Sequence, residues 1–481
     1  MLHRLTALFL LLSLLLSTVG CAKSAPRLDP KNPVRIELWH YYNGPQQEAF
    51  NALLDEFNQT EGMRLGVTVE GYSQGSIGQL TQSVLDSANK KAGAKPVPQI
   101  FAAYADTAFE VDALGLVAEL DPYFTQQELE AYLPEYLSEG RFDKNGKLKI
   151  FPIAKSSELM MINKTYWDRF AAATGATTAS LATMESLAAT AEAYYRWTDS
   201  LTPEPNDGKS LFGRDSMANY MFIGARELGV ELFQPTADGV VLNLDRAVLR
   251  RLWDNFYLPY VKGYFTHFGK FRSDDIKTGD ILAMVGSTTG IIYLPKQVTN
   301  ADNSTEPIEL LTLPAPCFEG GAAFAVQQGA GMVVTKSDPL TELAAVTFLK
   351  WFTQKEQNMR FAVAAGYLPV TKAAATPDAL EDFLAKHSDI NSNLAAALRV
   401  SYQVTDSHTM YAPKAFDNSN AARNLLEHSL IEQCTADRKL VQAALAAGSS
   451  LEQAVAPYVT DARFDQWLSS LTTALEQIIT S

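Results

Sequence analysis

The chain has 481 residues, a formal net charge of −14, 47% hydrophobic residues and three cysteines. This length exceeds what one ordinary hydrophobic core serves, so we expect two domains. The acidic charge argues against nucleic acid and anionic membrane surfaces as partners. The six histidines are scattered, and the sequence holds no CxxC, HExxH or EF-hand loop. We therefore expect no metal site and no cofactor.

Residues 1–20 have the pattern of a secretory signal peptide, with a short basic start, an apolar run and small residues before Cys21. A cysteine at this place resembles the lipobox of bacterial lipoproteins. The resemblance implies a mature chain that begins at a lipidated Cys21, followed by a tether over 21–33. Cleavage with an unmodified Cys21 remains the alternative. Cys317 and Cys434 could pair in an oxidising compartment, but their surroundings favour two buried thiols.

The first folded stretch predicts a strand that ends in a cluster of rings. Apolar and polar residues alternate over 34–38, and Trp39, His40, Tyr41 and Tyr42 follow before Gly44 and Pro45 break the pattern. In open α/β sheets, ligands bind at the carboxyl ends of strands. Rings with polar tips suit a sugar or another polyol. The alternative is that single rings of this cluster pack in the core.

Strands and helices then alternate along the chain. Apolar runs predict further strands over 66–70, 97–104, 281–285, 310–316 and 329–334. Helical periodicity predicts helices over 180–197, 217–229, 244–260 and 341–353, and the remainder of the chain is largely helical. This order predicts an α/β protein with parallel strands and right-handed crossovers.

Four motifs carry a family resemblance when they are taken in order. They are the helix with Leu-Leu-x-Glu-Phe-Asn at 53–58, the strand with a proline at 150–164, Ala-Met-Val-Gly-Ser at 283–287, and Gly-Tyr-Leu-Pro-Val-Thr at 366–371. Together they resemble the extracellular solute-binding proteins of ABC transporters, a family that includes maltose-binding and glycerol-3-phosphate-binding proteins. The resemblance implies a periplasmic-binding-protein-like α/β fold, with two α/β lobes, a ligand cleft between them and three interlobe crossings.

Carried onto this sequence, the family pattern places 34–151 and 314–353 in the first lobe and 155–312 and 356–481 in the second. It implies a monomeric lipoprotein that is anchored outside the cytoplasm, in the periplasm or at the cell surface. Such a protein captures a small-molecule solute and delivers it to the permease subunits of an ABC importer. We expect a sugar or polyol, with a glycerol phosphate or glycerophosphodiester as the alternative ligand.

The predicted ligand contacts lie in loops at strand ends of both lobes. They are Trp39, His40, Tyr41, Tyr72, Ser73, Tyr104, Ser287, Thr288, Gly331 and Tyr367. The turn that carries Tyr367 is assigned to the second lobe, so its ring would cover the ligand only when the lobes close. Lys155, Arg214 and Arg423 could hold a phosphate, although salt-bridged surface positions are the preferred interpretation.

One motif raises an enzymatic alternative. Gly71 to Gly75 fits the G-x-S-x-G pattern between a strand and a helix, as in serine esterases that use a nucleophile such as Ser73. No oxyanion segment precedes it, and the histidines downstream have no distinguishing context. The chain also lacks a GxxxxGK[ST] sequence, the usual phosphate loop of ATP-hydrolysing proteins. We therefore expect a binding protein rather than an enzyme.

Overall fold

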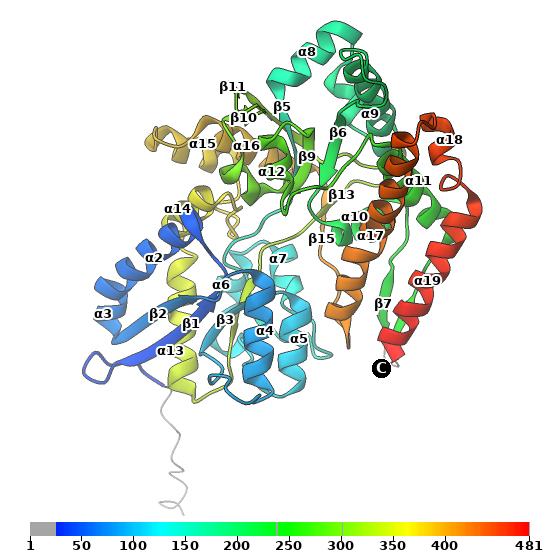
Figure 1. The fold of residues 1–481 in the computed structure, drawn as a ribbon. Coiled ribbons are helices and arrows are strands. Elements are labelled where there is room, and N and C mark those ends of the chain that lie inside the picture. Colours follow the sequence, from blue (N-terminus) through cyan, green and yellow to red (C-terminus); the bar gives the residue numbers. More distant parts are fainter. Residues whose placement is uncertain (1–25, 237–238, 301, 481) are drawn as a thin grey trace, which may run out of the picture.

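The computed structural model describes residues 26–236, 239–300 and 302–480. It has two α/β lobes, one above the other in Figure 1, and each is built around its own sheet. The predicted signal peptide and the lipidated Cys21 lie outside the described residues.

The first lobe is built on a five-stranded sheet in the order β2-β1-β3-β14-β4. Its strands are β1 (Val34–His40), β2 (Val67–Ser73), β3 (Ile100–Ala103), β4 (Ile150–Phe151) and β14 (Gly331–Val334). Its helices are α2 (Gly44–Gln59), α3 (Glu61–Leu65), α4 (Ile77–Ala88), α5 (Ala105–Ala113), η1 (Asp121–Tyr123), α6 (Gln126–Glu130), α7 (Pro134–Glu139), α13 (Pro339–Phe352) and α14 (Lys355–Ala365).

The second lobe is built on a four-stranded sheet in the order β12-β5-β9-β6. Its strands are β5 (Glu158–Asn163), β6 (Ser210–Arg214), β9 (Ile281–Ser287) and β12 (Leu310–Pro314). Its helices are α8 (Lys164–Thr174), η2 (Thr178–Leu181), α9 (Met184–Asp199), α10 (Met217–Glu227), α11 (Arg246–Lys262), α12 (Arg272–Lys277), η3 (Thr288–Tyr293), α15 (Pro377–Lys386), α16 (Ser392–Ser407), α17 (Ser419–Ala446), α18 (Leu451–Val455) and α19 (Asp461–Thr480).

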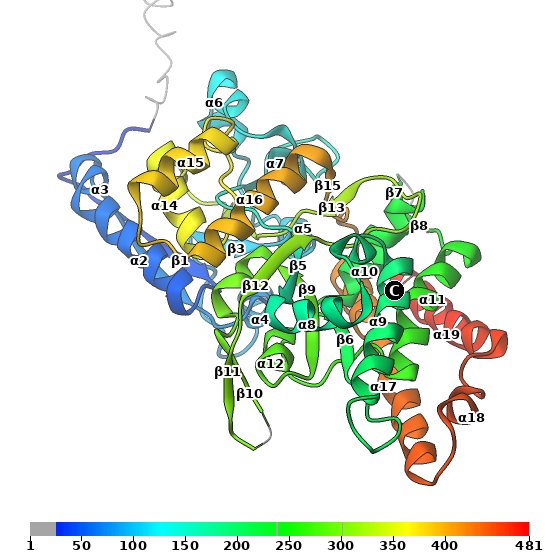
Figure 2. The same cartoon turned by 90° about the horizontal axis from the view of Figure 1, so that it is seen from above.

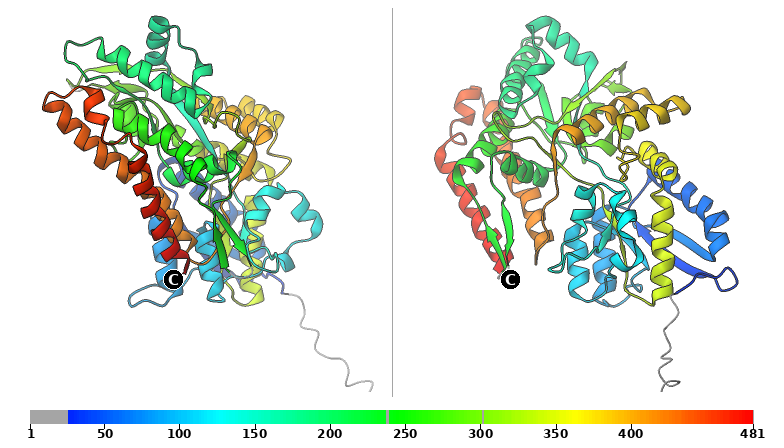
Figure 3. Two further views of the ribbon diagram at one scale, coloured as in Figure 1. Left: turned by 90° about the vertical axis from the view of Figure 1, so that its right-hand side faces the viewer. Right: turned by 180° about the vertical axis from the view of Figure 1, so that it is seen from behind.

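Two hairpins extend the second lobe. The pair β10 (Gln297–Thr299) and β11 (Thr305–Pro307) projects from it in Figure 2. The pair β7 (Phe233–Thr236) and β8 (Gly239–Leu242) runs beside α19, and Figure 3 shows this together with the neighbouring α17. The C-terminal helices therefore belong to the second lobe and reach down toward the first.

The burial of each strand follows from its place in a sheet. On β1 the side chains of Ile36 and Leu38 are buried, while Arg35 is exposed at the start of the strand. β5 is buried along its whole length, because it lies between β12 and β9 and is covered on both faces. A central strand needs apolar residues at consecutive positions for this reason.

The predicted parallel arrangement is only partly right. β1 is parallel to β2 and β3, and β6 is parallel to β9, as expected for strands joined by helical crossovers. In contrast, β14 is antiparallel to β3 and β4, and β5 is antiparallel to β9 and β12. These strands enter their sheets from the connections between the lobes, so no crossover helix fixes their direction.

The connections between the lobes place two segments differently from the predicted division. Phe318 and Val326 pack in the core of the second lobe, although the returning segment was expected in the first lobe from residue 314. Val326 ends β13 (Phe324–Val326), which pairs with β15 (Thr409–Tyr411). Conversely, α14 packs on α2, with the Phe361 ring centroid 5.7 Å from that of Phe50. In the turn that follows α14, the Tyr367 ring therefore packs in the core of the first lobe, whereas the next residue, Leu368, packs with Met161 and Met284 of the second lobe.

Candidate functional site

A cleft is lined by residues of both lobes and of the connection between them. Tyr104, Asp106 and Glu139 come from the first lobe, and Asn219 and Arg423 come from the second. An adjoining hollow shares Glu139 with this cleft and continues it outward. A binding site between two lobes is the usual place for a small polar ligand.

The wall on the first lobe is built at the carboxyl end of β3. Tyr104 follows the strand directly and precedes α5, and Asp106 lies in the first turn of that helix. The Oδ1 atom of Asp106 accepts a hydrogen bond of 2.7 Å from the backbone N–H of Thr107. Burial raises the pKa of the Asp106 carboxyl and the pKa of the Tyr104 hydroxyl. This wall offers one phenol and one carboxyl to a ligand.

The wall on the second lobe is held by a chain of hydrogen bonds. Arg423 Nη2 donates to Asn219 Oδ1 at 3.0 Å, and Asn219 Nδ2 donates to Glu158 Oε1 at 2.8 Å. Glu158 also forms a buried ion pair with Arg214. Arg214 is therefore neutralised behind the wall, whereas Arg423 is oriented toward the cleft by a neutral amide.

The connection between the lobes buries a second ion pair. Lys155 Nζ lies 2.8 Å from Glu139 Oε2 and donates to the carbonyl of Gly329, also at 2.8 Å. Gln327 Nε2 donates to the same carboxylate at 2.5 Å. The expectation of surface positions is thus wrong for Lys155 and Arg214, which are both buried and paired.

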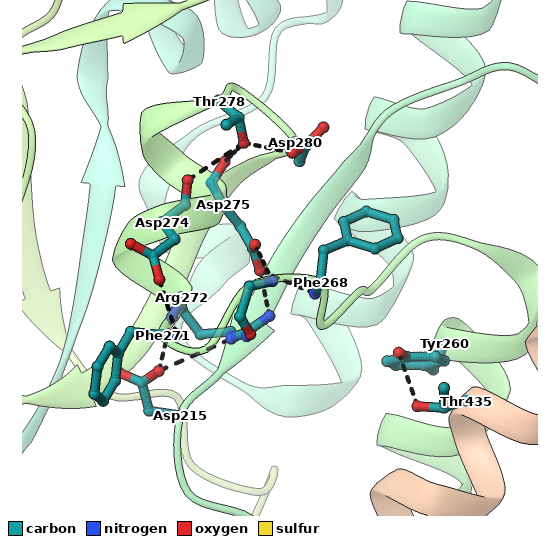
Figure 4. Close-up of polar contacts among 11 residues, drawn as sticks. Asp215, Tyr260, Phe268, Phe271, Arg272, Asp274, Asp275, Thr278, Asp280 and Thr435 are labelled. Carbon is teal, nitrogen blue, oxygen red and sulfur yellow. Dashed lines mark hydrogen bonds and ion pairs between the residues drawn. The ribbon is translucent and has the colours of Figure 1, made fainter.

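The carboxyl end of β6 is tied to the start of α12, as Figure 4 shows. Asp215 Oδ1 accepts a hydrogen bond of 2.8 Å from the backbone N–H of Arg272. The Arg272 guanidinium is fully buried and bonds to Asp275 and to the Gly269 carbonyl. Burial raises the pKa of Asp215 to about 6. These residues have a structural role, because their polar atoms bond to one another within the second lobe.

Three of the predicted tyrosines come together beside the cleft. Tyr104 lines it, and the Tyr41 hydroxyl lies 3.0 Å from the Tyr367 hydroxyl. Tyr367 is only 3% exposed and stacks on Phe361 with a centroid distance of 5.8 Å. Its position differs from the expectation of a ring on the second lobe, because α14 carries the Gly366 turn onto the core of the first lobe.

The other predicted rings are used in packing or lie at the surface. Trp39 is 3% exposed, and its Nε1–H donates to Glu37 Oε1 at 2.6 Å. His40 is buried, and its Nδ1 accepts the backbone N–H of Tyr42 at 3.2 Å. Tyr72 is exposed, and its hydroxyl donates to a Glu70 oxygen at 2.9 Å. These three side chains do not line the cleft described above.

Ser73 has a structural partner rather than a catalytic one. Its Oγ donates to the carbonyl of Tyr42 at 2.9 Å. His40 lies opposite Ser73 in the strand pairing. No hydrogen bond joins Ser73 to a histidine within residues 26–236, 239–300 and 302–480. The serine–histidine pair of an esterase is therefore not formed here.

Three small residues on the predicted list hold the connection between the lobes. Ser287 Oγ lies 3.0 Å from Thr289 Oγ1, and the Thr288 N–H donates to the Ser157 carbonyl at 2.9 Å. A Cβ atom at Gly331 would lie 2.3 Å from Ile150 Cγ2, so only glycine fits there. None of the three residues lines the cleft described above.

The sequence drew attention to some cleft residues and missed others. Asp106 and Asn219 are polar residues beside a predicted strand and on a predicted helix, so their positions could have been chosen. Glu139, Gln327 and Lys414 carry no local signal, because the chain brings them to the cleft only through the fold.

The remaining predictions concern thiols, metals and membranes. Cys317 and Cys434 are both free thiols, but only Cys434 is buried as expected, because Cys317 is partly exposed. Among the residues described, no group of three or more histidines, cysteines or acidic residues could hold a metal ion. No helix in the described part of the chain is long and apolar enough to cross a membrane.

Comparison with known proteins identifies the family through a family model and the fold through solved structures. A family model for the bacterial extracellular solute-binding protein matches residues 52–386. No curated protein sequence matches significantly. Among solved structures, the cyclic alpha-maltosyl-1,6-maltose binding protein of Arthrobacter globiformis is 18% identical, with a TM-score of 0.59 over 93% of this chain and 99% of the other.

Two further solved structures resemble the chain with similar sequence identity and similar TM-scores. UgpB of Mycobacterium tuberculosis in complex with glycerophosphocholine is 17% identical, with a TM-score of 0.64 over 93% of this chain and 99% of that one. The MalE domain of Bdellovibrio bacteriovorus bound to maltotriose is 16% identical, with a TM-score of 0.63 over 93% and 100%. The predicted periplasmic-binding-protein-like fold is confirmed, and the chain belongs to the bacterial extracellular solute-binding proteins.

Proposed function

We propose that the protein captures a hydroxyl-rich solute in the cleft between its lobes and delivers it to the permease subunits of an ABC importer. The observation that carries the proposal is the cleft lined by Tyr104 and Asp106 on one wall and by Asn219 and Arg423 on the other. Phenol, carboxylate, amide and guanidinium groups together suit a ligand with several hydroxyl groups.

Closure of the lobes would complete the site. The first lobe, in this proposal, comprises 34–151 and 331–370, and the second comprises 158–326 and the chain from 377. A ligand that contacts both walls binds the closed form better than the open form, so it shifts the equilibrium toward closure. The buried pair of Lys155 and Glu139 lies in the connection between the lobes and could remain intact during this motion.

The ligand class draws support from the solved relatives. The Arthrobacter globiformis protein is a binding protein for cyclic alpha-maltosyl-1,6-maltose, and the Bdellovibrio and Mycobacterium proteins are bound to maltotriose and glycerophosphocholine. We infer a sugar or polyol for this chain, with a glycerol phosphate or glycerophosphodiester as the alternative. In this proposal the protein is a monomeric lipoprotein held by Cys21, it catalyses no reaction, and the importer supplies the energy for transport.

The proposed site can be tested with two cleft variants and one control. A thermal-shift screen of sugars, glycerophosphodiesters and polyol phosphates identifies a ligand through the stability that binding adds. We expect Tyr104→Ala and Asn219→Ala to weaken its binding by about 1–3 kcal/mol each, measured by calorimetry. Tyr72→Ala removes an exposed ring outside the cleft and should bind as the wild type does. Equal affinities for all four proteins would place the site elsewhere.

A further inference from the structure

The start of α17 forms one corner of the cleft. Lys414, Ser419 and Arg423 line the cleft at and just before this helix. The lower end of α17 lies beside α5 of the first lobe in Figure 1, and the two helices are in contact. The first N–H groups of a helix have no acceptor within it and carry a partial positive charge. This end of α17 is therefore a favourable place for an anion.

A second observation at this corner comes from Ser419. The residue is 8% exposed, and its Oγ has no hydrogen-bond partner among the residues that the structure describes. A buried hydroxyl without a partner is costly, so buried hydroxyl groups are normally bonded. Because Ser419 lines the cleft, its Oγ can bond to a ligand there.

Arg423 supplies a positive charge that the described part of the chain does not neutralise. Its Nη2 is bonded to the neutral amide of Asn219, and no carboxylate of a described residue lies within ion-pair distance. The buried cations around the site are different, since Lys155, Arg214 and Arg272 each pair with a carboxylate.

The opposite wall offsets only part of this charge, because the Asp106 carboxyl lines the same cleft and the Arg423 charge counteracts the rise that burial causes in the pKa of that carboxyl. Glu139 is already paired with Lys155 at 2.8 Å. Asp106 is the other carboxyl that lines the cleft, and it lies with Tyr104 at the end of β3. Lys414 is exposed on the same side as Arg423 and adds a second positive charge. The corner at α17 therefore has an excess of positive groups.

Another helix of the protein shows how such a corner binds an anion. At the start of α10, the Glu427 carboxylate accepts the Ser216 hydroxyl at 2.8 Å and the backbone N–H of Ala218 at 2.9 Å. A serine hydroxyl and free helix N–H groups thus hold a carboxylate of the protein itself. The start of α17 likewise brings a serine hydroxyl, that of Ser419, to the cleft, with Arg423 beside it, while the Ser419 N–H itself is bonded to the Phe416 carbonyl.

We propose that the transported solute carries an anionic group, a phosphate or a carboxylate, which binds at the start of α17 to Ser419, Arg423 and Lys414. The hydroxyl groups of the solute then face Tyr104 and Asp106 on the other wall. This inference rests on the proposed solute-binding function. It selects charged polyols, such as polyol phosphates and sugar acids, over neutral oligosaccharides.

The test compares charged and neutral probes of similar size. We would titrate the protein with glycerol 3-phosphate, glucose 6-phosphate, gluconate, glycerol and maltotriose, and with inorganic phosphate alone, at low and high salt. We expect the anionic probes to bind at least tenfold more tightly than the neutral ones, with affinity that falls as salt rises. Phosphate esters and gluconate distinguish a phosphate site from a carboxylate site.

Two variants locate the anion. Arg423→Gln should weaken anion binding at least tenfold, and Ser419→Ala should weaken it severalfold, while Arg246→Gln on the exposed face of α11 should have no effect. Melting temperatures without ligand check that each variant is folded. In addition, inorganic phosphate should raise the melting temperature of the wild type more than that of Arg423→Gln.

The possible outcomes separate this inference from the proposed function. Tight binding of maltotriose that depends on Tyr104 but not on Arg423 would overturn the anionic solute and keep the binding function. A phosphate effect that is equal in wild type and Arg423→Gln would also overturn it. If no member of the wider solute screen binds in a manner that depends on Tyr104 or Asn219, the proposed function itself fails.

Discussion

His40 links the stability of the first lobe to pH. The ring is buried between Tyr42 and Phe50, with centroid distances of 5.2 and 4.9 Å. Its Nδ1 accepts a backbone N–H, which requires the neutral ring. Burial lowers the pKa of His40 to about 4 from an ordinary value of 6.5. Below about pH 6.5, His40 is protonated in the unfolded chain. In the folded protein the same ring stays neutral until the pH reaches about 4.

We predict that His40 contributes a loss of stability as the pH falls from about 6.5 to 4, by up to about 3 kcal/mol. The sign follows from the lowered pKa, because protonation favours the unfolded chain throughout this interval. His267, whose pKa is also lowered to about 4, adds a similar loss. In His40→Asn, the decline of melting temperature with acid should be shallower than in the wild type. Parallel declines in both proteins would contradict the assignment to His40.

The four rings at 39–42 show what a sequence can say of a single residue. Strand alternation predicts that neighbouring side chains point to opposite faces, but β1 is a central strand with both faces covered. Trp39, His40 and Tyr42 are buried for this reason, and Tyr41 reaches Tyr367 at the edge of the cleft. Which rings meet a ligand therefore depends on the helices that cover the sheet.

The same limit applies to the charged residues. Arg423, Lys155 and Arg214 look alike in the sequence, and each could be a phosphate ligand. Lys155 and Arg214 pair with Glu139 and Glu158, and nothing local to either cation predicts its partner. Only the fold shows that Arg423 bonds to the side-chain amide of Asn219 and not to a carboxylate.

At the scale of elements, most strands and helices could be predicted from the sequence. The strand β9 was expected over 281–285 and extends over Ile281–Ser287, because it is a continuous apolar run in the middle of a sheet. The helix expected over 217–229 is α10, Met217–Glu227. Strand direction was not predictable for β5 or β14, because it depends on which lobe the chain comes from.

The helix α14 is the element whose place the sequence does not reveal. It follows α13 of the first lobe and precedes the helices of the second. Phe361 decides its position, since its ring contacts Tyr42 and Phe352, each at a centroid distance of 5.2 Å. This packing places the ring of Tyr367 in the core of the first lobe, where its hydroxyl meets that of Tyr41.

We predict that Phe361→Ala lowers the free energy of unfolding by about 3–5 kcal/mol, the usual cost of removing a buried phenylalanine ring. Glu356→Ala, at an exposed position on the same helix, should change it by less than about 0.5 kcal/mol. Urea unfolding measures both values. A loss of under about 1 kcal/mol for Phe361→Ala would mean that α14 does not belong to the core of the first lobe.

At the scale of the whole molecule, the two lobes are separate units that are joined by the connecting segments. Each lobe has its own core, so each can move as a unit while the connections bend. The cleft takes its walls from different lobes, and its two walls therefore separate when the lobes open. The family resemblance predicted this arrangement, whereas the residues that face the solute required the structure.

At the same scale, the proposed lipid anchor would fix where the molecule lies relative to the membrane. The tether over 21–33 leads into β1, so an anchor at Cys21 would attach the first lobe. The structure shows that the predicted tether is shorter than 21–33, because Leu28 packs on the core of the first lobe and Asp29 lies against Gly66. About seven residues from Cys21 to Leu28 can span at most about 25 Å when extended, which would keep the first lobe close to the membrane surface. An acidic chain gains nothing from anionic lipids, so covalently attached acyl chains would have to supply the membrane affinity.

We predict that cells labelled with palmitate incorporate the label into the wild-type protein and not into Cys21→Ser. The wild type should sediment with membranes, and the variant should remain in the soluble extracytoplasmic fraction with unchanged melting temperature and solute affinity. Cys317→Ser is the matched control, because it removes a partly exposed free thiol from the folded region and should keep both label and membrane association. Equal labelling of the wild type and Cys21→Ser would exclude lipidation at Cys21. The alternative would then hold, in which the signal peptide is cleaved and the protein is released with an unmodified Cys21.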